Sequence, residues 1–239
     1  MFSYELSEED LKDQGKCLAC LNEQMEIFNK CFECVKNVKL TDSRLSILCD
    51  EINIFHSSVN TILNIFTEED FCKEDCKNMI YPTLRRMYEK CLKLYYVFHN
   101  DTQMDGRYKS YIRDVEDEYR KMFNDLKNNN YQHENLPLPT KKFQEAEKLP
   151  NFECMLQKMT NINAKQNGKQ YNLSYLYPMY RIMSFYAHGN SNKATFEKLF
   201  GEKNCFSVIK VKIFINVLAN VYNVLIGKCI IAKGKADEE

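Results

Sequence analysis

Long stretches in which apolar residues recur every three or four positions constrain this sequence more than any other feature. In Glu8–Val38, for example, Leu21, Met25, Phe28 and Phe32 follow that spacing. It places the apolar side chains on one face of an α-helix, which other helices must then cover. Five further stretches predict helices over Asp42–Phe66, Asp75–His99, Asp105–Asn128, Leu173–His188 and Phe206–Ala232. The sequence therefore predicts an all-α fold.

Glycine and proline are too scarce for a protein built from β-strands. The 239 residues include 7 glycines and 5 prolines, whereas an all-β protein needs many tight turns formed by those residues. Long helices joined by short turns are typical of an up-and-down bundle, here of about six long helices. We expect one helical domain over residues 1–239, with a bundle core at about 8–128 and motif-bearing helices at about 151–232. The first four helices should form one antiparallel bundle, and the last two should pack onto it.

Two polar segments separate the predicted helices. Asn128–Pro139 is rich in asparagine and ends with two prolines, and Asn161–Gln170 is polar and contains Gly168. Both patterns are typical of loops. Between the two loops we expect short helices at Thr140–Lys148 and Asn151–Thr160.

The balance of charge argues against bulk electrostatic attraction to nucleic acid or to a membrane. The chain has 33 basic and 33 acidic residues, so its formal net charge is +0 at pH 7, which still leaves room for a local basic cleft. The first residues lack the pattern of a signal peptide. The longest apolar stretch, Ile213–Ile231, is interrupted by Asn216, Asn220, Asn223 and Lys228. We expect a cytoplasmic protein with no membrane contact.

The spacing of some of the 11 cysteines suggests a metal site that helix geometry opposes. Cys17 and Cys20 form one Cys-x-x-Cys pair, and Cys31 and Cys34 form another, as in four-thiolate zinc sites. Both pairs lie in one predicted helix, where fourteen residues span about 21 Å, further than the ligands of a single zinc ion can be apart. We expect free structural thiols in a reducing compartment, with no metal and no cofactor. A thiol-based redox or metal protein is the weakest of the alternatives.

A polar stripe on Leu173–His188 is the clearest functional signal in the sequence. Arg181, Ser184 and His188 stand at positions i, i+3 and i+7, so they share one face of a largely apolar helix. The dipole at a helix C-terminus raises the pKa of a histidine, which suits proton transfer near neutral pH. An arginine two turns earlier can neutralise charge that develops on phosphorus. The stripe is either a site for metal-free phosphodiester cleavage or a structural hydrogen-bond network.

A second candidate group lies on the predicted helix Asp75–His99. Arg85 and Glu89 are four residues apart, which predicts an ion pair within the helix. In the functional alternative this pair faces the polar stripe across the bundle. Glu89 would then orient Arg181 or His188, and an arginine beside it would supply a second phosphate contact.

These residues resemble a known superfamily. Arg181 and His188, with six residues between them, fit the arginine–four-to-six–histidine motif of the HEPN superfamily, the all-helical higher-eukaryote and prokaryote nucleotide-binding domains. Many members are metal-independent endoribonucleases of toxin–antitoxin, CRISPR and abortive-infection defence systems. Tyr180, Ser184 and His188 also match a Tyr-x-x-x-Ser-x-x-x-His stretch found in uncharacterised bacterial helical proteins, which share the Arg85-x-x-x-Glu89 pattern.

The resemblance implies a ribonuclease of bacterial antiphage defence or of a toxin–antitoxin pair. RNA would be its substrate, and a homodimer would join two Arg–His motifs in one cleft, with an antitoxin or defence-system protein as a possible partner. The expected catalytic residues are Arg181, His188 and Ser184, and the expected supporting residues are Glu89, Arg85 and Tyr180. The alternative is a non-catalytic helical sensor or adaptor that binds a nucleotide or a partner protein in the same cleft.

Overall fold

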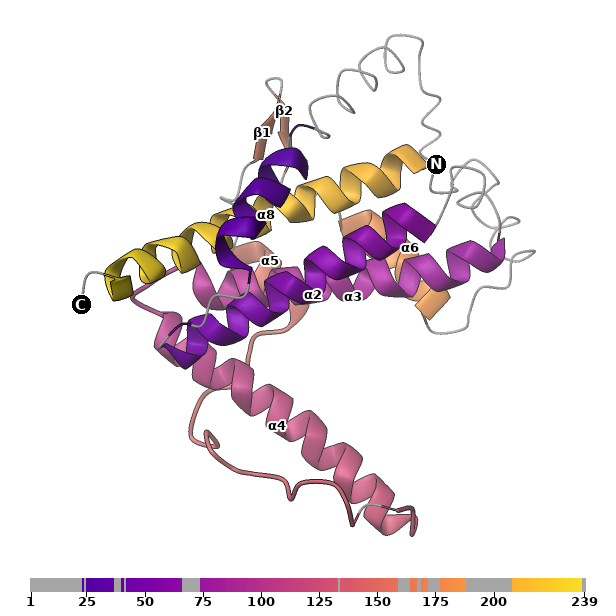
Figure 1. Cartoon of the computed structure of the whole chain (residues 1–239). Helices are drawn as coiled ribbons and strands as arrows, with labels where there is room; N and C mark the ends of the chain where they lie inside the picture. Colours follow the sequence, from indigo (N-terminus) through magenta and orange to yellow (C-terminus); the bar gives the residue numbers. More distant parts are fainter. Residues whose placement is uncertain are drawn as a thin grey trace.

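The structure is a computed structural model in which α-helices make up nearly all of the regular secondary structure. It describes residues 23, 25–36, 40, 42–65, 74–132, 134–158, 164–166, 169–171, 177–187 and 208–237. Its helices are α2 (Ser43–Ile65), α3 (Glu74–Phe98), α4 (Met104–Asn128), α5 (Phe152–Lys158), α6 (Tyr177–Ala187) and α8 (Val208–Asp237). Residues 25–35 are helical as well. The predicted all-α fold is confirmed, as Figure 1 shows.

Helix α3 lies at the centre of the bundle. It packs against α2, α4, α5, α6 and α8, and its Leu84, Tyr88 and Leu92 side chains are 0 % exposed. On the neighbouring helices, the ring of Tyr222 in α8 stacks on Phe55 of α2 at a centroid distance of 4.1 Å. Burial of these apolar side chains is the main source of stability in such a bundle.

Helix α8 is the apolar core helix that the sequence predicts at Phe206–Ala232. Its segment Phe214–Ala232 is long and apolar enough to cross a membrane, and 61 % of it is buried inside the structure. The buried core helix of a globular protein meets the same criteria. Since Phe214, Leu218 and Leu225 are 0 % exposed within this bundle, we assign the segment to the core.

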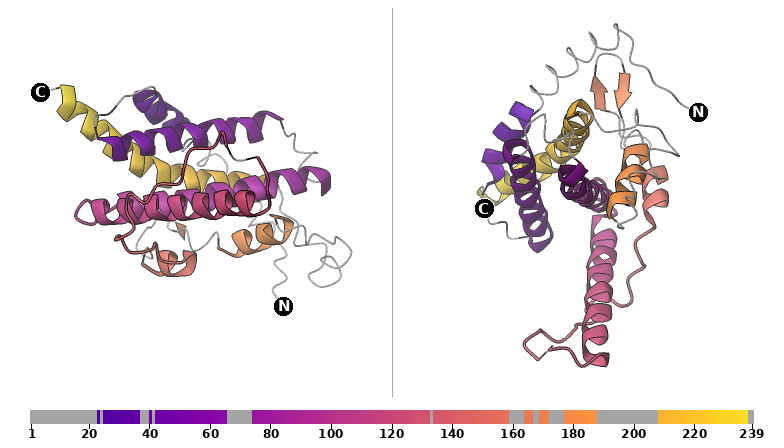
Figure 2. Two further views of the ribbon diagram at one scale, coloured as in Figure 1. Left: turned by 90° about the horizontal axis from the view of Figure 1, so that it is seen from below. Right: turned by 90° about the vertical axis from the view of Figure 1, so that its right-hand side faces the viewer.

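Helix α4 departs from the predicted arrangement. Its buried residues are Ser110, Tyr111 and Phe123, and its second half projects away from the bundle in Figures 1 and 2. The prediction that the first four helices form one bundle is therefore wrong for α4. Helix α8 packs against both α2 and α3 instead. It is apolar around most of its circumference, so its burial there removes more apolar surface from water.

The segment after α4 runs back along that helix, and the predicted helix Thr140–Lys148 is wrong. The stretch forms turns instead. The N–H of Lys142 donates to Glu116 Oε2 at 3.1 Å, and Tyr119 donates to a backbone carbonyl of the segment at 2.7 Å. Side chains of α4 thus supply partners for backbone groups of this segment, which pairs with α4 and forms no helix of its own. The next predicted helix, Asn151–Thr160, is confirmed as α5.

The predicted loop Asn161–Gln170 contains a short β-hairpin, which corrects that prediction. Strands β1 (Ala164–Gln166) and β2 (Lys169–Tyr171) are antiparallel. The sequence between them is Asn-Gly, the pair most typical of a two-residue hairpin turn. The signal was therefore present in the sequence, in a segment too polar to be predicted as strand.

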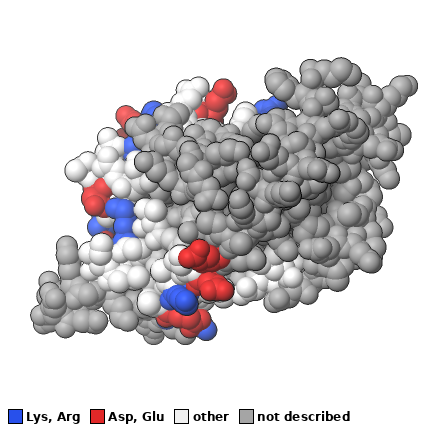
Figure 3. All heavy atoms as spheres, turned by 90° about the horizontal axis from the view of Figure 1, so that it is seen from above, with Lys and Arg blue, Asp and Glu red and all other residues white. Residues whose placement is uncertain are grey.

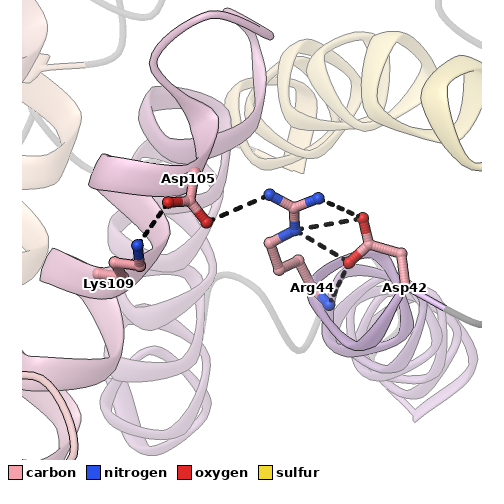
Figure 4. A network of polar contacts seen from close by, with 4 residues as sticks. All are labelled: Asp42, Arg44, Asp105 and Lys109. Atoms are coloured by element: carbon pink, nitrogen blue, oxygen red, sulfur yellow. Dashed lines mark hydrogen bonds and ion pairs between the residues drawn. The ribbon is translucent and has the colours of Figure 1, made fainter.

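A polar network joins the start of α2 to the start of α4 (Figure 4). Arg44 binds Asp42 at 2.7 Å and Asp105 at 3.4 Å, and Lys109 binds the other oxygen of Asp105 at 2.6 Å. The hydrogen bond from the Arg44 side chain holds the pKa of the Asp42 carboxyl below its ordinary value. This network connects the first turns of α4 to the start of α2, and the rest of α4 extends away from these contacts.

Acidic and basic side chains of described residues lie near one another on the face shown in Figure 3. On the face shown in Figure 3, Lys and Arg lie beside Asp and Glu and form no broad patch of one sign. This distribution agrees with a formal net charge of +0. A site for a charged ligand must therefore be a local arrangement of side chains.

Candidate functional site

Where α6 packs on α3, the predicted Arg85–Glu89 pair meets Tyr180, which precedes the predicted polar stripe of Arg181, Ser184 and His188. The hydroxyl of Tyr180 donates to Glu89 Oε1 at 3.0 Å, and Arg85 Nε donates to the same oxygen at 3.1 Å. The Arg85 guanidinium also lies 5.7 Å from the centre of the Tyr180 ring. The predicted ion pair within α3 is therefore confirmed, and Tyr180 of α6 binds to it across the two helices.

Aromatic rings enclose Tyr180 on the side away from solvent. Its ring stacks on Phe152 of α5 at 4.5 Å and lies 5.4 Å from the ring of buried Tyr88. Burial, followed by the hydrogen bond to Glu89, raises the pKa of the Tyr180 hydroxyl, so it stays protonated and acts as a donor. The sequence does not predict a role for Phe152, because no local pattern relates it to Tyr180, which is far away along the chain.

Ser184 lies one turn after Tyr180 on α6 and is partly buried. Its hydroxyl donates to the backbone carbonyl of Tyr180 at 2.9 Å. This hydrogen bond within the helix satisfies the only proton that the serine can donate. Any contact of Ser184 with a substrate must use its oxygen as an acceptor or break this bond.

Arg181 is exposed, although the residues on both sides of it are partly buried. No hydrogen bond or ion pair joins it to any other residue that the structure describes. Glu89, which was expected to orient Arg181 or His188, is engaged with Arg85 and Tyr180. His188 follows the last residue of α6 directly but lies outside the described residues.

Tyr180 and Arg181 are neighbours on α6, but only Tyr180 takes part in the contact with α3. A positive charge, a negative charge and a phenol meet in the contact of Arg85, Glu89 and Tyr180. This contact helps to fix the position of α6 on α3. Met183 follows Tyr180 by three residues and so lies on the same side of α6; it is 0 % exposed, so this side of the helix packs into the core. Arg181 is exposed and has no hydrogen bond or ion pair with another described residue.

The described part of the chain offers no metal site. No group of three or more His, Cys, Asp or Glu side chains in it is arranged to hold a metal ion. Of the cysteines considered for zinc, Cys31 and Cys34 are free thiols, whereas Cys17 and Cys20 lie outside the described residues. The geometry seen at α3 and α6 is that of a site built from charged and hydroxyl groups.

One comparison with known proteins gives a match. The family described as "Family of unknown function (DUF5677)" matches residues 56–206. This range covers more than half of the chain and includes α3, α6 and every residue of the candidate site. No curated protein and no solved structure matches the chain.

Proposed function

Because the chain belongs to the DUF5677 family, whose function is unknown, we propose a function from the residues of its own site. The protein is a metal-independent endoribonuclease of the HEPN type, with Arg181, Ser184 and His188 at its catalytic centre. One observation carries the proposal: Tyr180 is tied to Glu89, while Arg181, the next residue, is exposed. An arginine presented by a fixed helix suits the binding of a phosphate group.

The proposed reaction is a transfer of phosphate within the RNA strand. The ribose 2′-hydroxyl attacks phosphorus, and His188 takes its proton as general base. The bond from phosphorus to the 5′-oxygen of the next nucleotide breaks, and a proton from the second His188 of a homodimer goes to that oxygen. Arg181 neutralises the charge that develops on the phosphorane. The products are a 2′,3′-cyclic phosphate and a 5′-hydroxyl.

The remaining residues of the site act on the position of α6. Glu89 and Arg85 hold Tyr180, and Tyr180 fixes the first turn of the helix that carries Arg181. We assign these three as positioning residues. The biological setting that fits is bacterial antiphage defence or a toxin–antitoxin pair, with a homodimer as the active form and an antitoxin or defence-system protein as a partner.

Cleavage of RNA in the absence of divalent metal tests the proposal. Purified full-length protein is incubated with tRNA and total RNA in EDTA, beside Arg181→Ala and His188→Ala. Loss of a general acid–base group lowers the rate by about 10²- to 10⁴-fold, and loss of a group that stabilises developing charge lowers it by about 10²- to 10³-fold. We expect the wild type to cut RNA and both variants to lose that activity.

Matched variants separate catalysis from folding and from general charge. Lys121→Ala removes an exposed cation of α4 and should leave cleavage unchanged. Tyr180→Phe keeps the ring but removes the hydroxyl that binds Glu89, so it should lower kcat by less than Arg181→Ala does. Cleavage that survives both Arg181→Ala and His188→Ala would place the reaction elsewhere.

A non-catalytic sensor or adaptor is the second candidate. It is favoured by the closed hydrogen bonding of the α3–α6 contact, in which the Ser184 hydroxyl is already paired within its own helix. Such a protein would bind a nucleotide or a partner protein without turnover. Folded, dimeric wild-type protein that cuts no RNA under any of the conditions above would support this candidate over the ribonuclease.

A further inference from the structure

A cavity of about 500 Å³ lies where the end of α3, the start of α4 and the segment before α5 meet. Its size falls in the range of pockets that hold small ligands. The buried side chains of Tyr96 and Ser110 line it, together with Gly106 in the first turn of α4. It lies outside the α3–α6 contact, and nothing in the proposed reaction uses it.

Positive charge dominates the lining of this cavity. Four cations line it, Arg107, Lys109, Lys148 and Lys158, against one carboxylate, Glu147. Of these cations, Lys109 is paired with a carboxylate, that of Asp105. Lys148 has no hydrogen bond or ion pair with another described residue. Within the described part of the chain, Lys158 approaches the Tyr96 ring, at 6.0 Å, and pairs with no carboxylate. The cavity therefore carries positive charge that the described protein does not neutralise.

Arg107 is held firmly without being neutralised. It donates to the backbone oxygen of Tyr96 at 2.7 Å and to the side chain of Gln103, and its guanidinium lies 4.1 Å from the centre of the Tyr96 ring. It also lies 3.3 Å from Nδ1 of His99. Every one of these partners is uncharged or can remain so. Burial, and to a smaller extent the charge of Arg107, lowers the pKa of His99, as expected beside an uncompensated cation.

The start of α4 adds to the positive electrostatic potential of the cavity. The residue before the helix, Gln103, makes no side-chain cap to the first turn, so backbone N–H groups at the positive end of the helix dipole lack that partner. A Cβ added at Gly106 would meet nothing within 4 Å, which leaves this side of the cavity open. The cavity thus combines a held arginine and lysines without a described carboxylate partner with a helix start.

We propose that this cavity binds a phosphate group, carried either by a small phosphorylated molecule or by an RNA strand. Arg107 provides the fixed contact at the floor, and Lys148 and Lys158 close over the phosphate from the segment before α5 and from the end of α5. The Tyr96 ring is occupied by cations, so the cavity recognises charge and offers no free aromatic face to a base.

The cavity and the α3–α6 contact lie close to each other along α3. Tyr96 stands seven residues after Glu89, which is about 10 Å along the same side of the helix. Helix α5 links the two places, because Phe152 at its start stacks on Tyr180 and Lys158 at its end approaches Tyr96. About three stacked nucleotides of one strand span that distance. The phosphate site itself does not depend on the proposed cleavage.

Binding measured with two probes tests the site. Isothermal titration uses pyrophosphate, and fluorescence anisotropy uses a labelled ten-nucleotide 2′-O-methyl RNA, which lacks the attacking hydroxyl and cannot be cut by the proposed reaction. The double variant Lys148→Ala, Lys158→Ala should bind at least about tenfold more weakly, because each charged hydrogen bond contributes on that scale. For the RNA probe it should also reduce the dependence of binding on salt.

A second pair of variants changes the charge of the cavity at a position with free space. Gly106→Glu adds a negative charge, and Gly106→Gln adds a neutral side chain of the same size. Only Gly106→Glu should weaken binding strongly. The double variant Lys121→Ala, Lys127→Ala removes two exposed cations of α4 outside the cavity and should bind like the wild type.

The outcomes separate the sources of the phosphate. Weakening of both probes by the cavity variants supports a site that an RNA strand uses, and weakening of pyrophosphate alone supports a small phosphorylated ligand. Absence of binding to either probe by the wild type overturns the proposal. Equal weakening in the cavity and control variants overturns it too, whether or not the protein cleaves RNA.

Discussion

Two polar sites on the same side of α3 differ in whether their charged side chains are paired within the protein. At the α3–α6 contact, Glu89 accepts from both Arg85 and Tyr180, and aromatic rings pack against Tyr180. At the cavity beside Tyr96, cations face open space and carboxylates are scarce. The first place holds two helices together, and the second is open to a ligand.

This difference assigns separate roles to residues that look alike in the sequence. Arg85 and Arg107 are both partly buried arginines, but Arg85 has a carboxylate partner and Arg107 has uncharged partners. A paired arginine stabilises the fold, and an arginine held by neutral groups keeps its charge for a ligand. Arg181 differs from both, because it is exposed and has no partner among the described residues.

The largest expected effect removes the support that both places share. Leu92 stands on α3 between Glu89 and Tyr96 and is 0 % exposed. Leu92→Ala should lower the free energy of unfolding by about 2–5 kcal/mol through lost burial and a cavity, as measured by urea denaturation. Leu63→Ala on α2, at a position 38 % exposed, is the matched control and should cost much less. Equal losses in the two variants would mean that α3 is not the centre of the core.

A smaller effect distinguishes the closed contact from the open cavity. Glu89→Ala removes the acceptor that Arg85 and Tyr180 share. Because the Glu89 side chain is 32 % exposed, we expect a loss of about 1 kcal/mol in the free energy of unfolding. Lys158→Ala in the cavity should change it by less than about 0.5 kcal/mol. If Lys158→Ala proved the more destabilising of the two, the distinction between a holding contact and a binding cavity would fail.

The smallest effect depends on pH and on Tyr180. Burial and the hydrogen bond to Glu89 raise the pKa of this hydroxyl in the folded state, so the contribution is complete below the unfolded pKa of about 10. It is lost as the pH rises through the folded pKa. In urea denaturation from pH 8 to 11, the wild type should lose more stability than Tyr180→Phe. Parallel curves for the two proteins would show that Tyr180 titrates as it does in the unfolded chain.

The sequence predicts the elements that have a strong apolar period. The range Asp75–His99 is observed as α3 (Glu74–Phe98), and Asp105–Asn128 as α4 (Met104–Asn128). Their lengths follow from local spacing alone. The projection of α4 away from the bundle cannot be predicted from local spacing. It depends on which helix, α4 or α8, offers more apolar surface to α2 and α3.

The candidate site is predictable in part for the same reason. The pair Arg85–Glu89 is local on one helix, so its spacing predicts it, and its position opposite α6 follows from the bundle. The stacking of Phe152 on Tyr180 and the cavity at Tyr96 join residues from α3, α4 and the segment leading into α5. No local spacing relates those residues, and the segment before α5 was expected to be helical.

The chemical nature of the cleaved RNA ends distinguishes the proposed metal-independent ribonuclease from every alternative. Full-length protein is incubated with tRNA in EDTA, and the new 3′ ends are identified by mass spectrometry, with Arg181→Ala and His188→Ala as controls. We expect 2′,3′-cyclic phosphate ends that both variants fail to produce. Uncut RNA with folded protein, or new ends that carry a 3′-hydroxyl, would contradict it.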